Sequence, residues 1–201
     1  MNKNKILIAS NNKNKIKEIK KILHFDDIDF ITKSNLPDVE EDKDSFLGNA
    51  YKKAHVIAKK FNIVSMSDDS GIEVYSLNGE PGVYSARYAG KDQDDEKNNV
   101  KLLSKLKNKH DRRARFVAVI VISRPDGKYW VSRGICEGKI AKKPRGNNGF
   151  GYDPIFQPEN FNRTTAELSP DEKNKISHRG KALRKLYKSI KKNKKEIFKK
   201  N

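Results

Sequence analysis

The sequence predicts an α/β fold with a mixed β-sheet. Strand-like and helix-like segments alternate through the first half of the chain, a pattern typical of parallel β-α units. Two strand-like segments joined by a short turn follow in the second half and predict an antiparallel hairpin. The chain has 201 residues, which fits one domain, or one domain with two lobes around a cleft.

The first half of the chain predicts strands at residues 5–9 and 28–31 and a helix at residues 12–23. Ser45 is a suitable N-cap for a further helix that ends at Phe61, because its side-chain oxygen can accept a backbone N–H of the first turn. Residues 63–66 and 72–75 predict two strands on either side of the polar segment Ser67-Asp68-Asp69-Ser70-Gly71.

The second half predicts a helix at residues 92–106, acidic at its start and basic later, which complements the helix dipole. Residues 115–123 and 129–137 predict the hairpin strands, with a turn at Pro125-Asp126-Gly127. Pro170 suits the first turn of a helix, and residues 178–190 continue as a helix with Leu183, Leu186 and Ile190 facing inward.

The composition is strongly basic, with 44 Lys and Arg against 26 Asp and Glu, a formal charge of +18. From residue 181 onward the chain is Lys-rich and Glu196 is its only acid. A nucleic-acid surface and a merely solvated basic surface both fit this pattern. We favour the second and expect no nucleic-acid partner, because few aromatic residues stand among the lysines to stack on bases.

The sequence also bears on location. The single cysteine, Cys136, has no partner for an internal disulfide, which suits a reducing compartment. No segment approaches the ~20 apolar residues that cross a bilayer. The apolar run near the start of the chain, Ile6-Leu7-Ile8-Ala9, is too short for the core of a signal peptide. We therefore expect a cytoplasmic protein without a membrane partner.

A first candidate site follows the first predicted strand. Ser10, Asn11, Asn12, Lys13, Asn14 and Lys15 combine a hydroxyl, amides and lysines at the start of a helix. Backbone N–H groups at a helix N-terminus bind phosphate readily. The GxxxxGK[ST] spacing of a P-loop is absent, and a capped helix start with solvated lysines explains the local pattern equally well.

A second candidate site is acidic and consists of Glu40-Glu41 and Asp68-Asp69. Two carboxylates ~4 Å apart repel by ~4 kcal/mol at an effective dielectric constant of about 20, and a bridging cation removes that cost. Oxygen ligands with room for water and phosphate suit Mg²⁺. An exposed acidic loop explains Glu40-Glu41 alone, whereas Asp68-Asp69 ends an apolar strand and can be held rigidly.

Two further clusters lie near the C-terminus. Residues 146–154 offer glycines for close backbone approach and the flat rings of Phe150 and Tyr152, although a glycine-rich turn with core aromatics is the simpler interpretation. Lys173 and Arg179 offer donors for carbonyl or phosphate oxygens, or simply form a basic helix face. A lone histidine such as His178 is more often structural than catalytic. No nucleophilic triad can be assembled.

Taken in order, these segments resemble the inosine triphosphate pyrophosphatase family, also described as XTP/dITP diphosphatases. The similarity extends from Ser10 to Gly180 and includes the motifs Ser10-x-Asn12-x-x-Lys15, Glu40-Glu41, Asn49-Ala50-x-x-Lys53-Ala54, Ser67-Asp68-Asp69-Ser70-Gly71, Pro81-Gly82-x-x-Ser85-Ala86-Arg87, Gly149-Phe150-Gly151-Tyr152-Asp153-Pro154-Ile155-Phe156 and Ser177-His178-Arg179-Gly180. Each motif is short, and their order over most of the chain makes the resemblance specific.

The resemblance implies one two-lobed α/β domain over residues 1–201, with a long mixed central β-sheet and flanking helices, a cleft between the lobes and a homodimer. It implies hydrolysis of ITP, dITP and XTP to the monophosphate and pyrophosphate, which cleanses the nucleotide pool. Glu40 and Asp69 would hold Mg²⁺, supported by Glu41 and Asp68. Asp69 would also act as general base, and Lys15 would assist catalysis.

Substrate contacts are implied in the same way. The triphosphate would lie against residues 10–15, and the substrate would also contact Ser70. The base would be bound by the remaining predicted residues, which are Phe150, Gly151, Tyr152, Asp153, Lys173, His178 and Arg179.

The chain departs from the family pattern at two positions. Asn11 stands where glycine is common, and Gly48 stands where a glutamate is frequent, so position 48 is not expected to bind metal. Two alternative functions stay open: a basic nucleic-acid-binding protein without catalysis, and a pyrophosphatase for other modified nucleotides.

Overall fold

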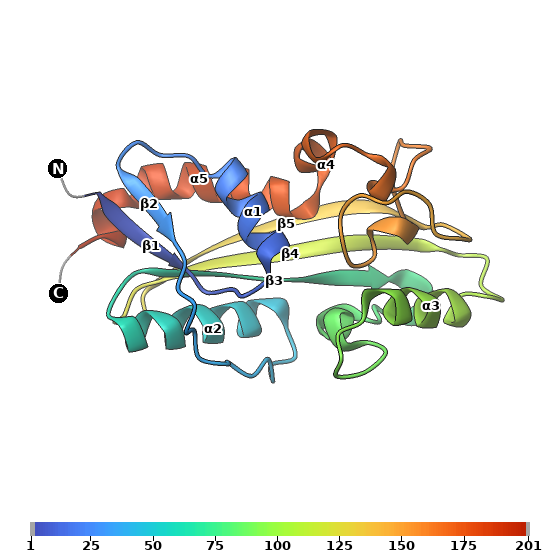
Figure 1. Ribbon diagram of the computed structural model, residues 1–201, viewed down its shortest axis with the longest axis horizontal. Coiled ribbons are helices and arrows are strands. Elements are labelled where there is room, and N and C mark those ends of the chain that lie inside the picture. The colour runs from blue at the N-terminus through green and yellow to red at the C-terminus, as the bar shows by residue number, and fades with distance from the viewer. Residues whose placement is uncertain (1–2, 200–201) are drawn as a thin grey trace. The chain divides into compact units, whose positions relative to one another are not determined.

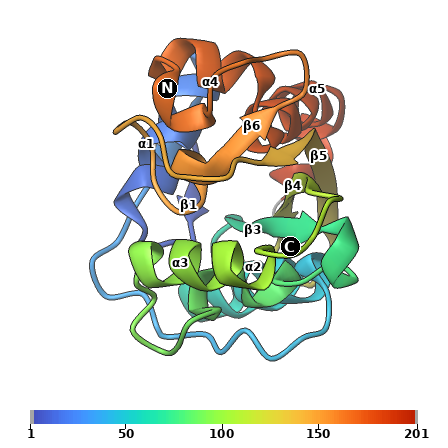
Figure 2. The same cartoon turned by 90° about the vertical axis from the view of Figure 1, so that its right-hand side faces the viewer.

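The computed structural model describes residues 3–199. Within them, six strands form one sheet in the order β2-β1-β3-β4-β5-β6, flanked by helices (Figure 1). The strands are β1 (Asn4–Ile8), β2 (Ile28–Ile31), β3 (Ser65–Val74), β4 (Arg113–Ser123), β5 (Tyr129–Ile140) and β6 (Phe156–Pro158). The first three pair in parallel, whereas β5 and β6 pair antiparallel (Figure 2). The predicted α/β fold with a mixed sheet is confirmed.

The chain divides into two compact units. Unit 1 comprises Met1–Asp69, Ala118–Gly134 and Gly180–Asn201, and unit 2 comprises Ser70–Val117 and Ile135–Arg179. The predicted phosphate-binding turn and the acidic residues Asp68 and Asp69 belong to unit 1. The predicted base-binding residues belong to unit 2.

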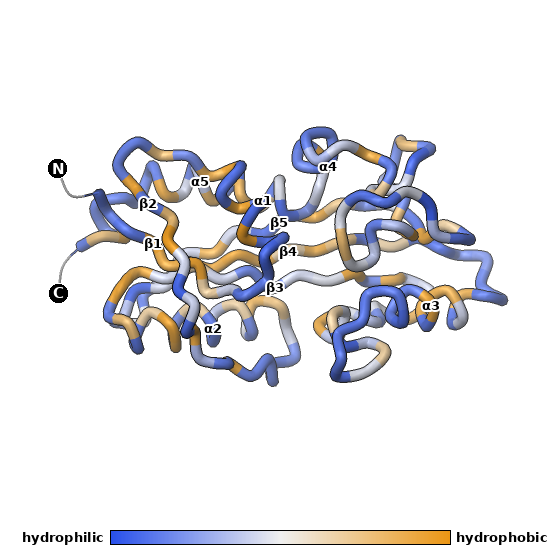
Figure 3. Tube along the Cα trace, viewed as in Figure 1, coloured by the Kyte–Doolittle hydropathy of each residue, from blue (hydrophilic) through white to orange (hydrophobic). Residues whose placement is uncertain are grey.

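The core of unit 1 has a layer on each face of the sheet. Ile6 and Ile8 of β1 pack with α1 (Lys13–Ile22) and with the apolar side of α5 (His178–Ile197), while the alternate residue Leu7 packs with Ile57 of α2 (Phe46–Phe61). Side chains alternate between the faces of a strand, which explains why one apolar strand serves both layers. In Figure 3 apolar stretches run along the strands, whereas apolar and hydrophilic residues alternate along the helices. The only tryptophan, Trp130, is partly buried against the layer of α1 and α5.

The core of unit 2 is built around α3 (Asp95–Lys105). Leu102 of α3 and Leu106, which caps it, are fully buried and belong to the same apolar cluster as Ile72 of β3 and Phe116 of β4. Short 3-10 helices, at Tyr75–Leu77, Gly82–Arg87, Asp153–Ile155 and Thr165–Glu167, connect the longer elements of this unit. Helix α4 (Pro170–Ile176) begins with proline as predicted, after a capping box of Ser169 and Glu172.

The prediction of two strands around residues 67–71 is wrong, because β3 is a single strand of 10 residues that passes through them. Hydrogen bonding between strands uses backbone groups alone, so polar side chains need not end a strand. Ser67, Asp68 and Asp69 are buried inside β3, and Asp68-Asp69 does not end a strand as predicted.

Other boundaries also differ from the prediction. Helix α3 begins at Asp95, since Asp94 caps it by accepting the N–H of Lys97 at 3.0 Å. Helix α5 runs on to Ile197, whose burial continues the apolar side of the helix. Strand β6 was not predicted, because three residues are too few to form a recognisable pattern. In the described part of the chain, no helix is both long enough and apolar enough to cross a membrane.

Candidate active-site groups in the two units

The first site element is the α1 loop, defined here as Ser10–Lys15. The side chain of Asn12 caps α1, its Oδ1 accepting the backbone N–H of Asn14 at 3.0 Å and of Lys15 at 3.1 Å. Ser10 Oγ accepts the N–H of Asn12 at 3.2 Å. Asn11, Lys13 and Asn14 are exposed. The loop therefore presents polar side chains to solvent around a fixed helix start.

Lys15 connects the α1 loop to the acidic segment of β3. Its Nζ lies 2.9 Å from Asp68 Oδ1 and donates to the Asp68 carbonyl oxygen at 3.2 Å. The Asp68 side chain is fully buried, and that of Lys15 is 18% exposed. Both residues belong to unit 1, so the structure brings the predicted phosphate turn and the predicted acidic site together within one compact unit.

Asp69 occupies an unusual electrostatic environment. Burial raises the pKa of its carboxyl group from the ordinary value of 3.8 to about 6. Lys15 lowers this pKa, while Glu41 and Asp68 raise it through charge repulsion. The carboxyl group can therefore exchange a proton near neutral pH, which a general base requires.

Of the two predicted glutamates, Glu41 is the one that acts on the pKa of Asp69. Glu41 also forms an ion pair with Lys53 of α2 and is partly buried. Glu40, the predicted metal ligand, is exposed. The consecutive glutamates are thus in different environments, a distinction that no local sequence pattern could reveal.

The segment between Glu41 and α2 depends on a small residue at position 48. A Cβ atom added to Gly48 would lie 2.8 Å from Lys43 Cβ, closer than side chains can pack. Asn49 holds the same segment through both of its amide atoms, accepting from Lys43 N at 2.9 Å and donating to Lys43 O at 3.2 Å. In this chain, the packing of Lys43 against position 48 therefore favours the glycine that departs from the family pattern.

The second site element is the aromatic loop of unit 2, defined here as Gly149–Asp153. Gly149 has a positive φ of 84°, and a Cβ there would lie 2.0 Å from Asp153 Oδ2, so only glycine fits. This approach allows Asp153 Oδ2 to accept the N–H of Phe150 at 2.8 Å. The loop is thereby folded around the Asp153 carboxylate.

Two buried cations lie over the ring of Phe150. Lys173 Nζ is 4.7 Å and Arg179 Cζ is 5.6 Å from the ring centroid, within the range of cation–π attraction. Lys173 also pairs with Asp153 at 2.5 Å, and Arg179 donates to Ser70 Oγ at 2.8 Å. Unit 2 therefore gathers five of the predicted substrate residues into one contiguous group.

Tyr152 and His178 have roles inside the protein. The hydroxyl of Tyr152 donates to the carbonyl oxygen of Ser85 at 2.8 Å, and burial raises the pKa of that hydroxyl. The His178 ring stacks on Phe116 with centroids 4.6 Å apart, and both side chains are buried. Their assignment as substrate contacts stays a prediction.

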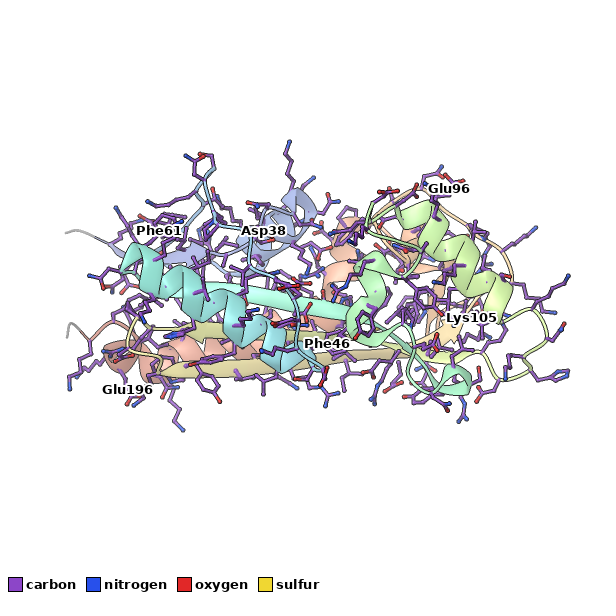
Figure 4. The ribbon with its side chains drawn as sticks, turned by 90° about the horizontal axis from the view of Figure 1, so that it is seen from below. Asp38, Phe46, Phe61, Glu96, Lys105 and Glu196 are labelled. Atoms are coloured by element: carbon purple, nitrogen blue, oxygen red, sulfur yellow. The ribbon has the colours of Figure 1, made fainter. Side chains whose placement is uncertain are left out.

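Two residues that the sequence prediction missed contact the aromatic loop. Asp95 and Asn99 of α3 both bind the backbone of Gly151. They lie four residues apart and continue the helix face of Leu102 and Leu106 (Figure 4 shows α3 between the labelled Glu96 and Lys105). Asn99, a buried polar residue on the inward side of the helix, offers a signal in the sequence, whereas Asp95 is exposed and offers none.

A metal ion would need ligands beyond the protein. Among residues 3–199, no three His, Cys, Asp or Glu side chains are grouped to hold a metal ion by themselves. Mg²⁺ commonly uses one or two carboxylates and completes its shell with water and phosphate oxygens. The buried, mutually repelling carboxylates around Asp69 therefore fit such a partial ligand set.

Comparison with known proteins assigns the chain to a family. A model of the Ham1 family matches residues 6–189. The chain belongs to the Ham1 family. Its solved structural relatives include the Ham1 protein of Staphylococcus aureus, with a TM-score of 0.86 and 47% identity over 94% of this chain and 99% of that one. A Ham1 protein from Coxiella burnetii has a TM-score of 0.89 and 41% identity, with the same coverage of 94% and 99%.

Curated relatives of this Ham1-family chain carry an enzymatic name. A Staphylococcus aureus protein named dITP/XTP pyrophosphatase is 50% identical over 181 residues, covering 89% of this chain and 92% of that protein. A Clostridium perfringens protein of the same name is 46% identical over 198 residues, covering 93% and 97%. The similarity thus spans nearly the whole length of these enzymes, and the resemblance drawn from the sequence motifs is confirmed.

Proposed function

We propose that this chain hydrolyses the non-standard purine nucleoside triphosphates ITP, dITP and XTP to the monophosphate and pyrophosphate, cleansing the nucleotide pool. Full-length relatives named dITP/XTP pyrophosphatase support the reaction. The observation that carries the proposal is the contact of Lys15 with Asp68, beside the Asp69 carboxyl group whose pKa is raised. A phosphate-binding helix start and a proton acceptor are thereby combined in one unit.

In this proposal the α1 loop binds the triphosphate. The dipole and N–H groups of the start of α1 attract anions, and Ser10, Asn11, Asn12, Lys13 and Asn14 supply further polar contacts. Lys15 stabilises negative charge that develops on the departing pyrophosphate. Its contact with Asp68 holds the ammonium group in place before substrate arrives.

Mg²⁺ is the proposed cofactor, held by Asp69 together with a neighbouring glutamate. Glu40 is the glutamate that the sequence resemblance suggests, and Glu41 is the one whose charge acts on Asp69. When bound, the cation would neutralise the triphosphate and polarise the α-phosphate. Separate Glu40→Gln and Glu41→Gln variants, compared by titration with MgCl₂, distinguish the two assignments: the ligand variant requires more magnesium.

Asp69 is the proposed general base. It orients a water molecule and accepts its proton while the water oxygen bonds to the α-phosphorus. The bond from the α-phosphorus to the bridging oxygen breaks, and that oxygen leaves with the pyrophosphate. Burial keeps the carboxyl group basic enough for this transfer, since its pKa of about 6 exceeds the ordinary 3.8.

Unit 2 is the proposed base-binding part. Phe150 and Tyr152 supply flat rings, and Lys173, His178 and Arg179 supply donors, with Asp153 fixing the ammonium group of Lys173 at 2.5 Å. Donors match the 6-oxo acceptor of hypoxanthine and xanthine but oppose the 6-amino donor of adenine. A site built on such hydrogen bonds can discriminate by ~10⁴–10⁵ against a base that leaves them unpaired.

Product analysis tests the reaction directly. The protein is incubated with ITP and MgCl₂, with and without EDTA, and the products are identified. Inosine monophosphate and pyrophosphate are expected, and only without EDTA. Inosine diphosphate and phosphate would show cleavage at the wrong bond, and equal turnover of ITP, XTP, dITP, GTP and ATP would defeat the base selectivity.

The role of Asp69 is tested separately. A folded Asp69→Asn variant is expected to lose nearly all turnover of ITP, because the amide cannot accept the proton. Near-normal turnover in that variant would remove Asp69 from catalysis.

A further inference from the structure

Helix α3 holds the aromatic loop by both polar backbone atoms of one residue. Asp95 Oδ2 accepts the N–H of Gly151 at 2.7 Å. Asn99 Nδ2 donates to the carbonyl oxygen of Gly151 at 3.0 Å. Asp95 and Asn99 are four residues apart, which places them on one side of the helix, one turn from each other.

Gly151 is the residue where this loop most needs restraint. Its φ of 64° lies in the left-handed region, and glycine has more backbone freedom than any other residue. A Cβ atom there would meet no other atom within 4 Å, so packing does not fix the conformation. The two hydrogen bonds from α3 supply the restraint that packing lacks.

The consequence extends to the neighbours of Gly151. On one side is Phe150, whose ring lies beneath Lys173 and Arg179. On the other is Tyr152, whose hydroxyl donates to Ser85 O at 2.8 Å. A rotation of the peptide groups at Gly151 would therefore reorient the ring of Phe150 against the two cations.

The same helix also fixes the segment that receives Tyr152. Asn98 Oδ1 accepts the N–H of Ala89 at 2.7 Å, and its Nδ2 donates to Ala86 O at 3.0 Å. Asn98 and Asn99 are buried, at 2% and 7% exposure. Consecutive asparagines on α3 thus hold two different loops of unit 2 through backbone atoms.

We propose that Asp95 and Asn99 are positioning residues for nucleotide recognition, which set the orientation of the aromatic loop and thereby the affinity for the purine base. This inference rests on the proposed function of the aromatic loop. Neither residue needs to touch the substrate, because each acts through Gly151. Loss of either hydrogen bond should weaken substrate binding and leave the chemical step nearly intact.

Steady-state hydrolysis of ITP with saturating MgCl₂ tests the proposal in Asp95→Ala and Asn99→Ala variants. We expect KM to rise about tenfold, the scale of one lost hydrogen bond to a charged or buried group, and kcat to change by less than about twofold. Asp95→Asn should restore KM, because its amide oxygen still accepts the N–H of Gly151. The magnesium concentration for half-maximal rate should not change, since its proposed ligands lie in unit 1.

Glu96→Ala is the matched control. Glu96 is an exposed acid in the same helix turn, and within residues 3–199 no hydrogen bond joins its side chain to the aromatic loop. Its removal weakens the helix dipole interaction as Asp95→Ala does, so a general effect on the start of α3 would appear in both variants. A KM that rises equally in both would overturn the proposal.

Hydrogen–deuterium exchange without nucleotide gives a readout independent of turnover. The amide of Gly151 should exchange faster in Asp95→Ala than in the wild type or in Glu96→Ala. Unchanged exchange and unchanged KM in Asp95→Ala would overturn the inference while the wild-type enzyme still hydrolyses ITP. A wild-type protein that does not hydrolyse ITP would instead overturn the proposed function and the nucleotide role of these residues, whatever the exchange shows.

Discussion

The Asp69 side chain combines two requirements that oppose each other. A general base must be deprotonated to act, yet burial favours the protonated form and raises its pKa to about 6. Lys15 offsets part of that effect, and Glu41 and Asp68 add to it. The free protein therefore carries a carboxylate that destabilises it at neutral pH, as is common where function sets the environment of a buried acid.

This conflict predicts the stability of Asp69→Asn in EDTA. Because the folded-state pKa is raised from 3.8 to about 6, the neutral form stabilises the folded protein below pH 3.8, and this stability is lost as the pH rises through 6. The uncharged asparagine escapes that loss. The free energy of unfolding of the variant minus that of the wild type should rise by roughly 1–3 kcal/mol between pH 4 and pH 8. Urea denaturation at each pH measures this difference. A constant difference across this range would contradict the assignment.

Lys15 differs from the other lysines of α1 because it forms an ion pair with the buried Asp68. Replacement by methionine keeps the length of the side chain but removes the ammonium group beside Asp68. We expect kcat/KM for ITP to fall by ~10²–10³, the usual cost of losing a group that stabilises transition-state charge. Lys17→Met is the matched control, because Lys17 is exposed one half-turn along the same helix. Equal losses in the two variants would indicate a general electrostatic effect only.

At the scale of whole elements, helix α4 depends on how it begins. Glu172 accepts the backbone N–H of Ser169 at 2.8 Å and pairs with Arg163 at 2.7 Å. The hydrogen bond from Ser169, followed by the contact with Arg163, lowers the pKa of Glu172 from 4.5 to about 2. The next residue is Lys173, whose buried ammonium group lies over the ring of Phe150.

Glu172→Gln should therefore lower the melting temperature at pH 7. Because the folded-state pKa is depressed, the stabilisation is present above pH 4.5 and is lost as the pH falls toward 2. The melting temperatures of variant and wild type should converge across that interval, as followed by circular dichroism. A difference that persists undiminished at pH 3 would show that charge is not the cause.

Elements with a strong periodic pattern could be predicted from the sequence, and those fixed by tertiary contacts could not. Helix α2 begins after Ser45 and ends at Phe61 as predicted, because its cap and apolar spacing are local properties. The polar segment of β3 predicts an interruption of the strand, because the sequence alone does not show that Asp68 has a lysine from another element as its partner. Strand β6 exists only through its pairing with β5.

The same division applies to the candidate sites. The α1 loop was recognisable because one short segment supplies most of its groups. The different environments of Glu40 and Glu41 depend on Lys53 and Asp69, which are distant in sequence. The contacts of Asp95 and Asn99 with Gly151 likewise join residues more than 50 positions apart, so no local motif predicts them.

At the scale of the whole molecule, the dominant property is its charge of +18. Self-repulsion of so many cations destabilises a compact state, and salt screens it. We expect the melting temperature to rise between 50 and 300 mM KCl at pH 7.5, because added salt shortens the range of repulsion between exposed cations and screens buried ion pairs much less. A matched measurement in isosmotic sucrose controls for solvent effects. A fall in melting temperature with KCl would mean that attractive ion pairs dominate.

The sequence resemblance predicts a homodimer, and the single cysteine and short apolar segments of the sequence predict a cytoplasmic location. A homodimer would sediment at twice the mass of 23.0 kDa, and sedimentation equilibrium over a range of concentrations decides between monomer and dimer. A cytoplasmic location predicts recovery with soluble marker enzymes after cell fractionation.

The solitary indole of Trp130 gives this protein a built-in optical reporter. Because that ring is partly buried against the core of unit 1, its fluorescence should report the melting of that unit. Tyrosines occur in both units, and far-ultraviolet dichroism averages over the entire backbone. Comparing the three signals in one denaturation series would reveal, without labels or truncation, whether the two halves of the chain lose their structure together or in succession.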